Sequence, residues 1–506
     1  MKSNQLGVVA AGHPQTARAA EIILEAGGNA FDASLAALAA ACVAEPILAS
    51  LGGGGFLLAH SSKSNTLYDF FVQTPQQRRA SEALDFYPIH ADFGAATQEF
   101  HIGQGSIAVP GMVKGIFTIH NELCSLPLNE IFSPAIEMAK TGIELNSFQA
   151  YIFRIIAPIL NATSEAHQLF ADPNVPDKLV SKGDVLRLTE LADTLLLLCD
   201  EGEALFYRGD IAKQIAKDCA ERGTLSLADL QHYQVIKRKP LEIQYRQRRI
   251  LTNPGPSTGG TLIHFALQLL ESLKSDVSPL AMARAMEMTN LWRQQGGLES
   301  AASSNEMTDY FKRLYQKHPL AQRGTTHISV ADKQGNLASL TLSNGEGSGY
   351  VVPGTGIMLN NMLGEEDLNQ GGFHNWPLNQ RLSSMMSPCL VLQEKGLSYA
   401  LGSGGSNRIR TAMLQVISHL LDHNLSITEA IESPRMHFED GLLNVEPTFP
   451  EAEVSELTRY FPNVKHWPEK NLFFGGVHGV VRDASDNSLH GAGDRRRGGV
   501  SVVVTS

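Results

Sequence analysis

The residues with the clearest chemical potential in this sequence are a neighbouring glycine and threonine, Gly324 and Thr325. A threonine at the start of a chain carries a hydroxyl nucleophile and, in its α-amine, a general base. The reference pKa of that amine, near ~8, suits it to accept the hydroxyl proton. To expose the amine, the Gly324–Thr325 bond must break, and the Thr325 hydroxyl can itself attack the unhindered Gly324 carbonyl. The pair therefore predicts a self-cleaving precursor.

A predicted β-hairpin over residues 325–343 positions this threonine. Strand-forming residues lie on both sides of a short turn, Lys333-Gln334-Gly335, in which Gly335 takes the left-handed position of a three-residue loop. In that register Asp332 pairs with Asn336, and Thr325 lies opposite Ser343 on the same face of the sheet. We expect the Ser343 hydroxyl to hydrogen-bond the Thr325 hydroxyl.

A glycine-rich turn over residues 401–409 is the second element that this chemistry needs. The tetrahedral intermediate requires preorganised hydrogen-bond donors for its oxyanion. The turn follows a predicted strand over residues 397–401 and precedes a predicted helix that begins near Thr411, where free N–H groups point outward. These N–H groups are candidate donors, and a connecting turn without a function is the alternative.

The order of the predicted elements indicates one large α/β domain. Helical periodicity dominates the first part of the chain, whereas short strands and glycine turns dominate from Thr325 onward. No fixed-period repeat or long linker separates the parts. The predicted helices include residues 15–26, 30–44, 128–140, 147–160, 188–199, 211–222, 411–421 and 450–460. A further helical stretch is expected to reach about Lys317, and the final run, 498–505, is predicted to be a buried strand.

The composition argues against several classes of protein. The chain has 41 Lys and Arg against 52 Asp and Glu, a net charge of −11, so nucleic acid is not an expected partner. No apolar run approaches the ~20 residues of a membrane-spanning helix, and the first apolar run is too short for a signal peptide. The five widely spaced cysteines lack zinc-site spacing and are expected to be reduced core thiols. We therefore expect a cytoplasmic protein that uses no metal or cofactor.

Several motifs together resemble the γ-glutamyltranspeptidase (glutathione hydrolase) family, in particular its cytoplasmic, signal-less branch. The resemblance runs nearly end to end. The motifs that carry it are Gly27-Gly28-Asn29-Ala30-Phe31-Asp32-Ala33, Gly52-Gly53-Gly54-Gly55, Ile107-Ala108-Val109-Pro110-Gly111, Gly324-Thr325-Thr326-His327-x-Ser329-Val330, Leu359-Asn360-Asn361, Arg381-Leu382-Ser383-Ser384-Met385-Met386-Ser387-Pro388 and Gly402-Ser403-Gly404-Gly405-Ser406.

The resemblance implies an N-terminal-nucleophile hydrolase of α/β (α+β) class. Its fold would be a four-layer αββα sandwich, in which two stacked, mainly antiparallel sheets are flanked by helices. The precursor would cut itself into a large chain, 1–324, and a small chain, 325–506, which together form one domain. Whether one such pair or a dimer of pairs assembles stays open.

The resemblance also implies the catalytic residues. Thr325 matches the nucleophile, and Ser343 stands where the family usually has a threonine as the hydroxyl partner. Gly404 and Gly405 match the oxyanion-hole pair, although this turn lacks the family's usual proline. His327 shares a face with Thr325 and is expected to be a hydrogen-bonded wall of the site.

A binding site for the acyl donor follows from the same resemblance. Ser383 and Ser384 match hydroxyls that hold the glutamyl α-carboxylate, and Asn344 matches an asparagine that contacts the same end. Glu365 falls where the family has an aspartate that binds the α-amino group. The acidic run that Glu365 begins has no histidine with it, so it does not indicate a metal site.

One departure from the family concerns Phe71. Family members that process glutathione have an arginine there, which clamps the α-carboxylate of the substrate, and phenylalanine offers no such contact. A γ-glutamyl (glutathione-like) amide therefore competes with another acyl amide, such as a glutaryl (cephalosporin-acylase-like) or oxamate-like one, as the small-molecule substrate. A third hypothesis is a homologue that does not cleave itself and acts as a binding protein.

Overall fold

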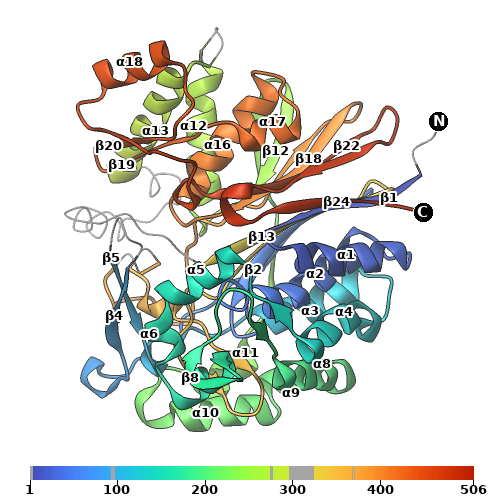
Figure 1. Ribbon diagram of the computed structural model, residues 1–506, viewed down its shortest axis with the longest axis vertical. Helices are drawn as coiled ribbons and strands as arrows, with labels where there is room; N and C mark the ends of the chain where they lie inside the picture. The colour runs from blue at the N-terminus through green and yellow to red at the C-terminus, as the bar shows by residue number, and fades with distance from the viewer. Residues whose placement is uncertain (1–3, 93–96, 274–276, 296–323, 367, 370) are drawn as a thin grey trace.

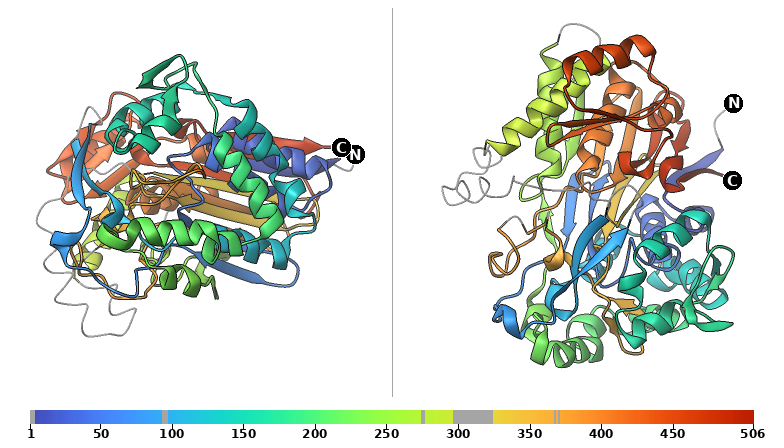
Figure 2. Two further views of the ribbon diagram at one scale, coloured as in Figure 1. Left: turned by 90° about the horizontal axis from the view of Figure 1, so that it is seen from below. Right: turned by 60° about the vertical axis from the view of Figure 1, so that its left-hand side comes forward.

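Two antiparallel sheets are stacked at the centre of the protein, and helices cover the outer face of each (Figures 1 and 2). The computed structural model describes residues 4–92, 97–273, 277–295, 324–366, 368–369 and 371–506. These residues form four layers in the order helices, sheet, sheet, helices. The αββα sandwich expected from the sequence is confirmed.

Each of the two sheets contributes residues to the candidate site. The first has seven strands in the order β10 (Ile236–Arg238), β3 (Asn65–Phe70), β2 (Gly54–His60), β14 (Leu337–Ser343), β13 (Thr325–Asp332), β1 (Gln5–Ala11) and β24 (Val500–Thr505). The second has six strands in the order β11 (Leu241–Tyr245), β12 (Arg248–Thr252), β17 (Cys389–Leu392), β18 (Leu397–Gly404), β22 (Gly476–Asp483) and β23 (Leu489–Ala492).

Different helices cover the two sheets (Figure 1). On the seven-stranded sheet lie α1 (Pro14–Glu25), α2 (Ala30–Ala44) and α3 (Met112–Leu123), with α4 (Leu128–Thr141) and α8 (Thr189–Glu201) outside them. On the six-stranded sheet lie α12 (Gly259–Glu271), α16 (Arg408–Leu421) and α17 (Ile427–Glu432), with α13 (Pro279–Gln294) and α18 (Glu451–Tyr460) further out.

Shorter elements complete the described part of the chain. The helices are α5 (Ser147–Ile155), α6 (Ala157–Leu160), α7 (Ser164–Phe170), α9 (Ala204–Tyr207), α10 (Asp210–Arg222) and α11 (Leu227–His232). The small sheets pair β4 (Tyr87–Asp92) with β5 (Thr97–Ile102), β6 (Ile143–Glu144) with β9 (Val185–Leu186), β7 (Ala171–Asp172) with β8 (Val175–Leu179) and β15 (Val351–Val352) with β16 (Ile357–Met358), and join β19 (Met436–Glu439), β20 (Leu442–Val445) and β21 (Val464–His466). None of the helices described is long and apolar enough to cross a bilayer.

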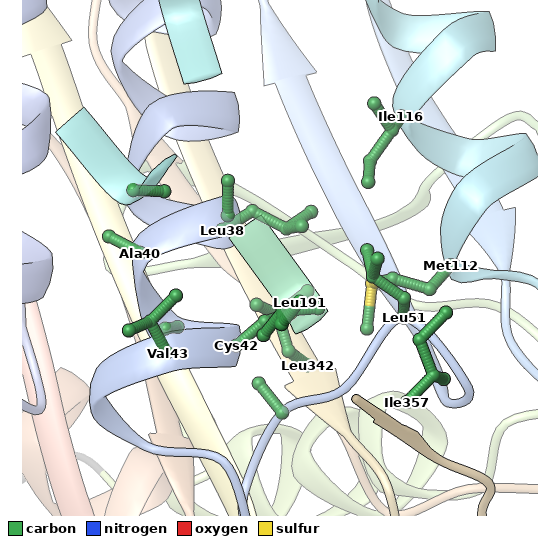
Figure 3. Packing of buried hydrophobic residues seen from close by; sticks show 14 of the residues in the cluster. Leu38, Ala40, Cys42, Val43, Leu51, Met112, Ile116, Leu191, Leu342 and Ile357 are labelled. Carbon is green, nitrogen blue, oxygen red and sulfur yellow. The ribbon is translucent and has the colours of Figure 1, made fainter. Parts of the chain in front are cut away.

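Alternation along β13 divides its side chains between two cores. Ile328 and Val330 belong to the core under the first helical layer, whereas Ala331 belongs to the core between the sheets. Every residue of α2 is buried, and its small side chains let the helix lie close to the sheet. Figure 3 shows Leu38 and Cys42 of α2 in the cluster that also contains Leu342 of β14. This packing supports the hairpin from behind.

Two of the elements expected from the sequence need correction, and a third lies partly outside the described residues. The single helix expected over 147–160 is two helices, α5 and α6, because Pro158 has no N–H to continue the hydrogen-bond ladder. The final strand is not buried: β24 is an edge strand, and 37% of Val503 is exposed. The helical stretch expected to reach about Lys317 is described as α13 only to Gln294, and residues 296–323 lie outside the description.

None of the five cysteines forms a disulfide, but only three of them are buried as the sequence predicts. Cys42, Cys219 and Cys389 are buried, as core thiols should be. Cys124 and Cys199 are half-buried on the helical layer.

Candidate active site

The β13–β14 hairpin places Thr325 directly opposite Ser343, as the sequence register predicts. Gly335 has a φ of +92°, which the turn requires. The Asp332 side chain accepts hydrogen bonds from the N–H groups of Gln334 and Asn336 and, at 2.9 Å, from the N–H of Ala30 at the start of α2. The hairpin is therefore fixed at its turn, and its open end carries the two hydroxyl residues.

The hydroxyl of Ser343 does not take the partner expected from the sequence. It donates a 2.7 Å hydrogen bond to the carbonyl oxygen of Gly324 rather than to the Thr325 hydroxyl. It also accepts a bond of 3.1 Å from the N–H of Gly345. In the intact chain, the bond that would be cut thus has a hydrogen-bond donor on its carbonyl oxygen, where negative charge would develop during attack.

Replacing Ser343 by alanine should slow self-cleavage about 100-fold, the usual cost of losing one oxyanion donor. Ser343→Thr keeps the hydroxyl and should cleave within about tenfold of the wild-type rate. The appearance of the small chain on denaturing gels, sampled over time, measures both rates. Equal rates for wild type and Ser343→Ala would show that the bond to the Gly324 carbonyl is not used.

The turn between β18 and α16 lies beside Thr325. A Cβ on Gly404 would be only 2.3 Å from the Thr325 carbonyl oxygen, so glycine permits this close approach. Gly405 has a φ of +127°, which side chains other than hydrogen rarely tolerate. Helix α16 begins at Arg408, three residues earlier than expected, so the glycine pair lies near a helix N-terminus. Neither glycine is among the residues that line the pocket described below, so the oxyanion role stays a prediction.

A buried arginine, Arg497, lies behind this turn. A Cβ on Gly404 would be 3.3 Å from its Nη1 atom. Burial lowers the pKa of Arg497 to about 10, while Asp494 and Glu346 attract its positive charge. Its Nε and Nη2 atoms make no hydrogen bond to any other described residue. A positive charge of this kind adds to the electrostatic field of the turn.

A pocket of about 500 Å³, including its open mouth, brings most of the predicted residues together. The lining consists of Phe71, Thr258, Gly324, Thr325, Ser343, Glu365, Leu368, Ser383, Ser384, Met385, Met386, Ser406, Asn407 and Ile409. Asn344 does not line it: this side chain is fully buried and donates to the Met358 carbonyl at 3.4 Å. Among the described residues, the pocket wall contains one acidic group and no basic one.

The two serines predicted to hold a carboxylate differ in their hydrogen bonds. The Oγ of Ser383 is buried and has no hydrogen-bond partner in the described part of the chain. Ser384 is anchored, because its Oγ accepts from the N–H of Met386 at 3.1 Å and its carbonyl oxygen accepts from the hydroxyl of Ser257 at 2.6 Å. Among the described residues, Ser383 is thus the hydroxyl with no competing bond, while Ser384 accepts one bond and keeps its own proton to donate.

Phe71 lies where the resemblance implies an arginine. It is buried, lines the pocket and stacks on Phe56 with the ring centroids 5.4 Å apart. A nearby arginine, Arg381, does not substitute for the missing cation. Its guanidinium pairs with Asp69, with Nε 3.2 Å from Oδ1, and also donates to the carbonyl of Phe71. The positive charge of Arg381 is therefore held behind the pocket wall.

His327 is hydrogen-bonded, as predicted, but it is not among the residues that line the pocket. It is fully buried, with Nδ1 2.8 Å from the hydroxyl of Thr341 and Nε2 2.9 Å from that of Ser329. Burial, and secondarily the neighbouring His478, holds the pKa of His327 well below its usual range. The imidazole is therefore neutral, and it fixes the contact between the two sheets next to Thr325.

Several pocket residues were not singled out by sequence reasoning. Thr258 comes from the loop over residues 254–260, whose prolines and glycines indicate a turn but not where it lies. Met385, Ser406 and Asn407 lie within segments that the sequence analysis considered, but no role was assigned to them. Glu346 follows Ser343 by three residues and gave no signal, yet it contacts Gly324 directly.

Among the described residues, no group of three or more His, Cys, Asp or Glu side chains is arranged to hold a metal ion.

Comparison with known proteins adds an independent line of evidence. The family model described as Gamma-glutamyltranspeptidase matches residues 16–293 and 292–504. The Acylase ACY 1 proenzyme of Pseudomonas sp. (strain SE83) is 28% identical over 543 residues, covering 99% of this chain and 94% of that protein. The Glutathione hydrolase proenzyme of Escherichia coli (strain K12) is 29% identical over 459 residues, covering 82% of this chain and 78% of that protein. The crystal structure of cephalosporin acylase from Bacillus halodurans shares the fold, with a TM-score of 0.82, 24% identity and coverage of 99% and 96%.

Proposed function

The chain belongs to the gamma-glutamyltranspeptidase family of N-terminal-nucleophile enzymes, and from this membership we propose that it is a self-processing threonine amidohydrolase and acyltransferase. The single observation that carries the proposal is the geometry at Gly324 and Thr325. A threonine at the start of a strand lines a pocket, and the carbonyl before it is already hydrogen-bonded by Ser343. The proenzyme names of the relatives support processing of this chain as well.

Self-cleavage would convert the intact chain into two. The Thr325 hydroxyl oxygen attacks the carbonyl carbon of Gly324, and the bond from that carbon to the Thr325 nitrogen breaks. The nitrogen takes up the hydroxyl proton and becomes the α-amine, and Gly324 is left as an ester on Thr325. One water molecule then hydrolyses the ester, which yields a carboxylate on Gly324 and restores the hydroxyl.

The mature cycle would use the same hydroxyl on a small-molecule amide. The α-amine of Thr325 accepts the hydroxyl proton as the oxygen attacks the substrate carbonyl, and the leaving amine departs with that proton. Backbone N–H groups at Gly404 and Gly405 would stabilise the oxyanion. The acyl group on Thr325 then passes to water or to a second amine.

A γ-glutamyl amide such as glutathione is the proposed acyl donor. Its α-carboxylate would accept hydrogen bonds from Ser383 and Ser384, and its α-amino group would approach Glu365, the acidic residue of the pocket wall. The similarity to a glutathione hydrolase proenzyme supports this choice. The five unpaired cysteines support a reducing, cytoplasmic setting, which is part of the proposal.

A second candidate keeps the chemistry and changes the acyl group. Phe71 favours it, because the arginine that would clamp a glutamyl α-carboxylate is absent, and a glutaryl or oxamate-like acyl group also lacks the α-amino group of the glutamyl head. Leu368, Met385 and Ile409 add apolar surface to a wall whose other side chains are mostly polar. The acylase proenzyme among the relatives is consistent with this alternative.

Paired chromogenic anilides, one γ-glutamyl and one glutaryl, separate the two candidates. They differ only in the α-amino group, because glutaryl keeps a terminal carboxylate in the place of the α-carboxylate, so the ratio of their kcat/KM values reports recognition of the α-amino group. The proposal expects the γ-glutamyl anilide to be the better substrate. A preference for the glutaryl anilide would support the second candidate instead. If the cleaved enzyme turns over neither anilide, both candidate functions are wrong.

Replacing Phe71 by arginine should improve recognition of the γ-glutamyl head. A guanidinium at this position would pair with the α-carboxylate and lower KM for the γ-glutamyl anilide about tenfold, the modest end of what hydrogen bonds to charged groups provide. The KM for a butyryl anilide, which has no carboxylate, should change little, and Phe71→Leu, which adds no charge, serves as the matched control. An equal change for both anilides would mean that residue 71 does not face the α-carboxylate.

A further inference from the structure

Glu346 is a buried acidic residue that the proposed catalytic cycle does not use. It lies in the turn that follows β14, and only 4% of it is exposed. Its Oε1 atom accepts a 2.6 Å hydrogen bond from the backbone N–H of Gly324. Its own N–H donates to Oδ1 of Asn361 at 2.8 Å, which fixes the turn. A buried carboxyl group is thus held against the residue whose carbonyl would be attacked.

The second oxygen of Glu346 is also close to Gly324. A Cβ on Gly324 would be 3.3 Å from Oε2 and only 2.3 Å from the carbonyl oxygen of Gly345. Glycine at position 324 therefore lets the chain lie directly on the turn. The carboxyl group of Glu346 interacts with the positive charge of Arg497, which Asp494 also attracts.

Ser343 and Glu346 hold Gly324 from its two ends. The hydroxyl of Ser343 donates to the Gly324 carbonyl oxygen at 2.7 Å, while the carboxyl group of Glu346 accepts from the Gly324 N–H at 2.6 Å. Two such bonds restrict both backbone dihedrals of this residue, although glycine is otherwise the most flexible of all residues. The orientation of the carbonyl carbon relative to the Thr325 hydroxyl is therefore set by the turn.

We infer that Glu346 is a positioning residue for self-cleavage. This inference rests on the proposed function, since it assumes the cut between Gly324 and Thr325. Glu346 exchanges no proton in the step: the Thr325 oxygen bonds to the Gly324 carbon, the carbon–nitrogen bond breaks, and the hydroxyl proton ends on the Thr325 nitrogen. The carboxyl group only accepts the N–H bond that keeps the reacting atoms in place.

Two substitutions of similar size separate the hydrogen bond from the bulk of the side chain. Glu346→Leu removes the acceptor and should slow cleavage about 100-fold, as loss of a near-attack geometry does. Glu346→Gln keeps an acceptor oxygen and should stay within about tenfold of the wild-type rate. Glu366→Gln, in an exposed glutamate of another loop, is the matched control and should cleave as wild type does.

The rates come from cell-free synthesis of the full chain, sampled over time on denaturing gels, with intact masses to locate the cut. Melting temperatures are compared in the uncut background, Thr325→Ala against Thr325→Ala with Glu346→Leu, to detect a merely structural effect. The Glu346→Leu molecules that do mature should turn over a γ-glutamyl or glutaryl anilide with kcat per cleaved chain within about threefold of wild type, since the Gly324 carbonyl no longer has to be positioned once the chain is cut.

The outcomes distinguish the two claims. If the wild-type chain is never cut, the proposed function fails whatever Glu346 does. If wild type is cut and Glu346→Leu is cut equally fast, the inference about Glu346 is overturned while the proposed function stands. It is also overturned if Glu346→Leu lowers the melting temperature of the uncut chain by several degrees, or lowers kcat of matured enzyme as much as it lowers the cleavage rate.

Discussion

Replacing Thr325 by alanine should leave one uncut chain of 54.9 kDa without amidase activity. The substitution removes the hydroxyl that attacks Gly324, and without that cleavage no α-amine forms to act as the base. The wild-type chain should instead give fragments of about 35 and about 20 kDa, in proportion to residues 1–324 and 325–506. Denaturing gels show the fragments, and intact mass measurement must place the cut between Gly324 and Thr325.

The adjacent threonine provides a matched control for this experiment. Thr326 points to the other face of the sheet, where its hydroxyl donates to the buried Glu45 at 2.7 Å. Thr326→Ala should therefore still cleave and turn over substrate, while losing about 1–3 kcal/mol of stability because a buried carboxyl group loses a partner. Cleavage in Thr325→Ala, or an equally inert Thr326→Ala, would contradict the assignment of the nucleophile.

The hairpin that carries Thr325 could be predicted because its information is local. Strand alternation and the position of Gly335 fix the register over a few residues, and the structure has the same register. The layered fold was also accessible, since helices precede strands without a linker and the motifs resemble one family. What local pattern could not give is the choice of hydrogen-bond partner: register makes Ser343 face Thr325, but the Gly324 carbonyl is the acceptor that the Ser343 hydroxyl takes.

The pocket depends on contacts between segments that are distant in sequence. Phe71, Thr258 and Glu365 come from separate loops, and packing of the two sheets brings them to Thr325. The sequence also does not tell an edge strand from a buried one, so the apolar run ending in β24 was assigned to the interior. Asn344 illustrates the same limit, because one residue past a strand end the side chain can point into the pocket or away from it, and here it points away.

Replacing Gly404 by alanine should lower kcat and the cleavage rate at least 100-fold while the fold is retained. The added Cβ would lie 2.3 Å from the Thr325 carbonyl oxygen and 3.1 Å from its carbonyl carbon. Both of these are backbone atoms, so no side chain can rotate away, and either β18 or the first residue of β13 must move. Displacing the nucleophile by about an ångström is enough for a loss of this size.

The control for Gly404→Ala is Gly479, a glycine of the neighbouring strand β22 in the same sheet. A Cβ on Gly479 would also clash, but its two nearest contacts are side-chain ends, Leu401 Cδ2 at 2.4 Å and Ile427 Cδ1 at 3.1 Å, which can shift. Gly479→Ala should therefore cost about 1–3 kcal/mol of stability, the usual penalty of overpacking, with kcat changed only a few-fold. Comparing melting temperature with kcat in the two variants separates crowding of the core from displacement of Thr325. If both variants lose stability alike and only Gly404→Ala loses turnover, glycine is required at position 404 because the Thr325 backbone lies against it. Equal turnover in the two variants would contradict this explanation.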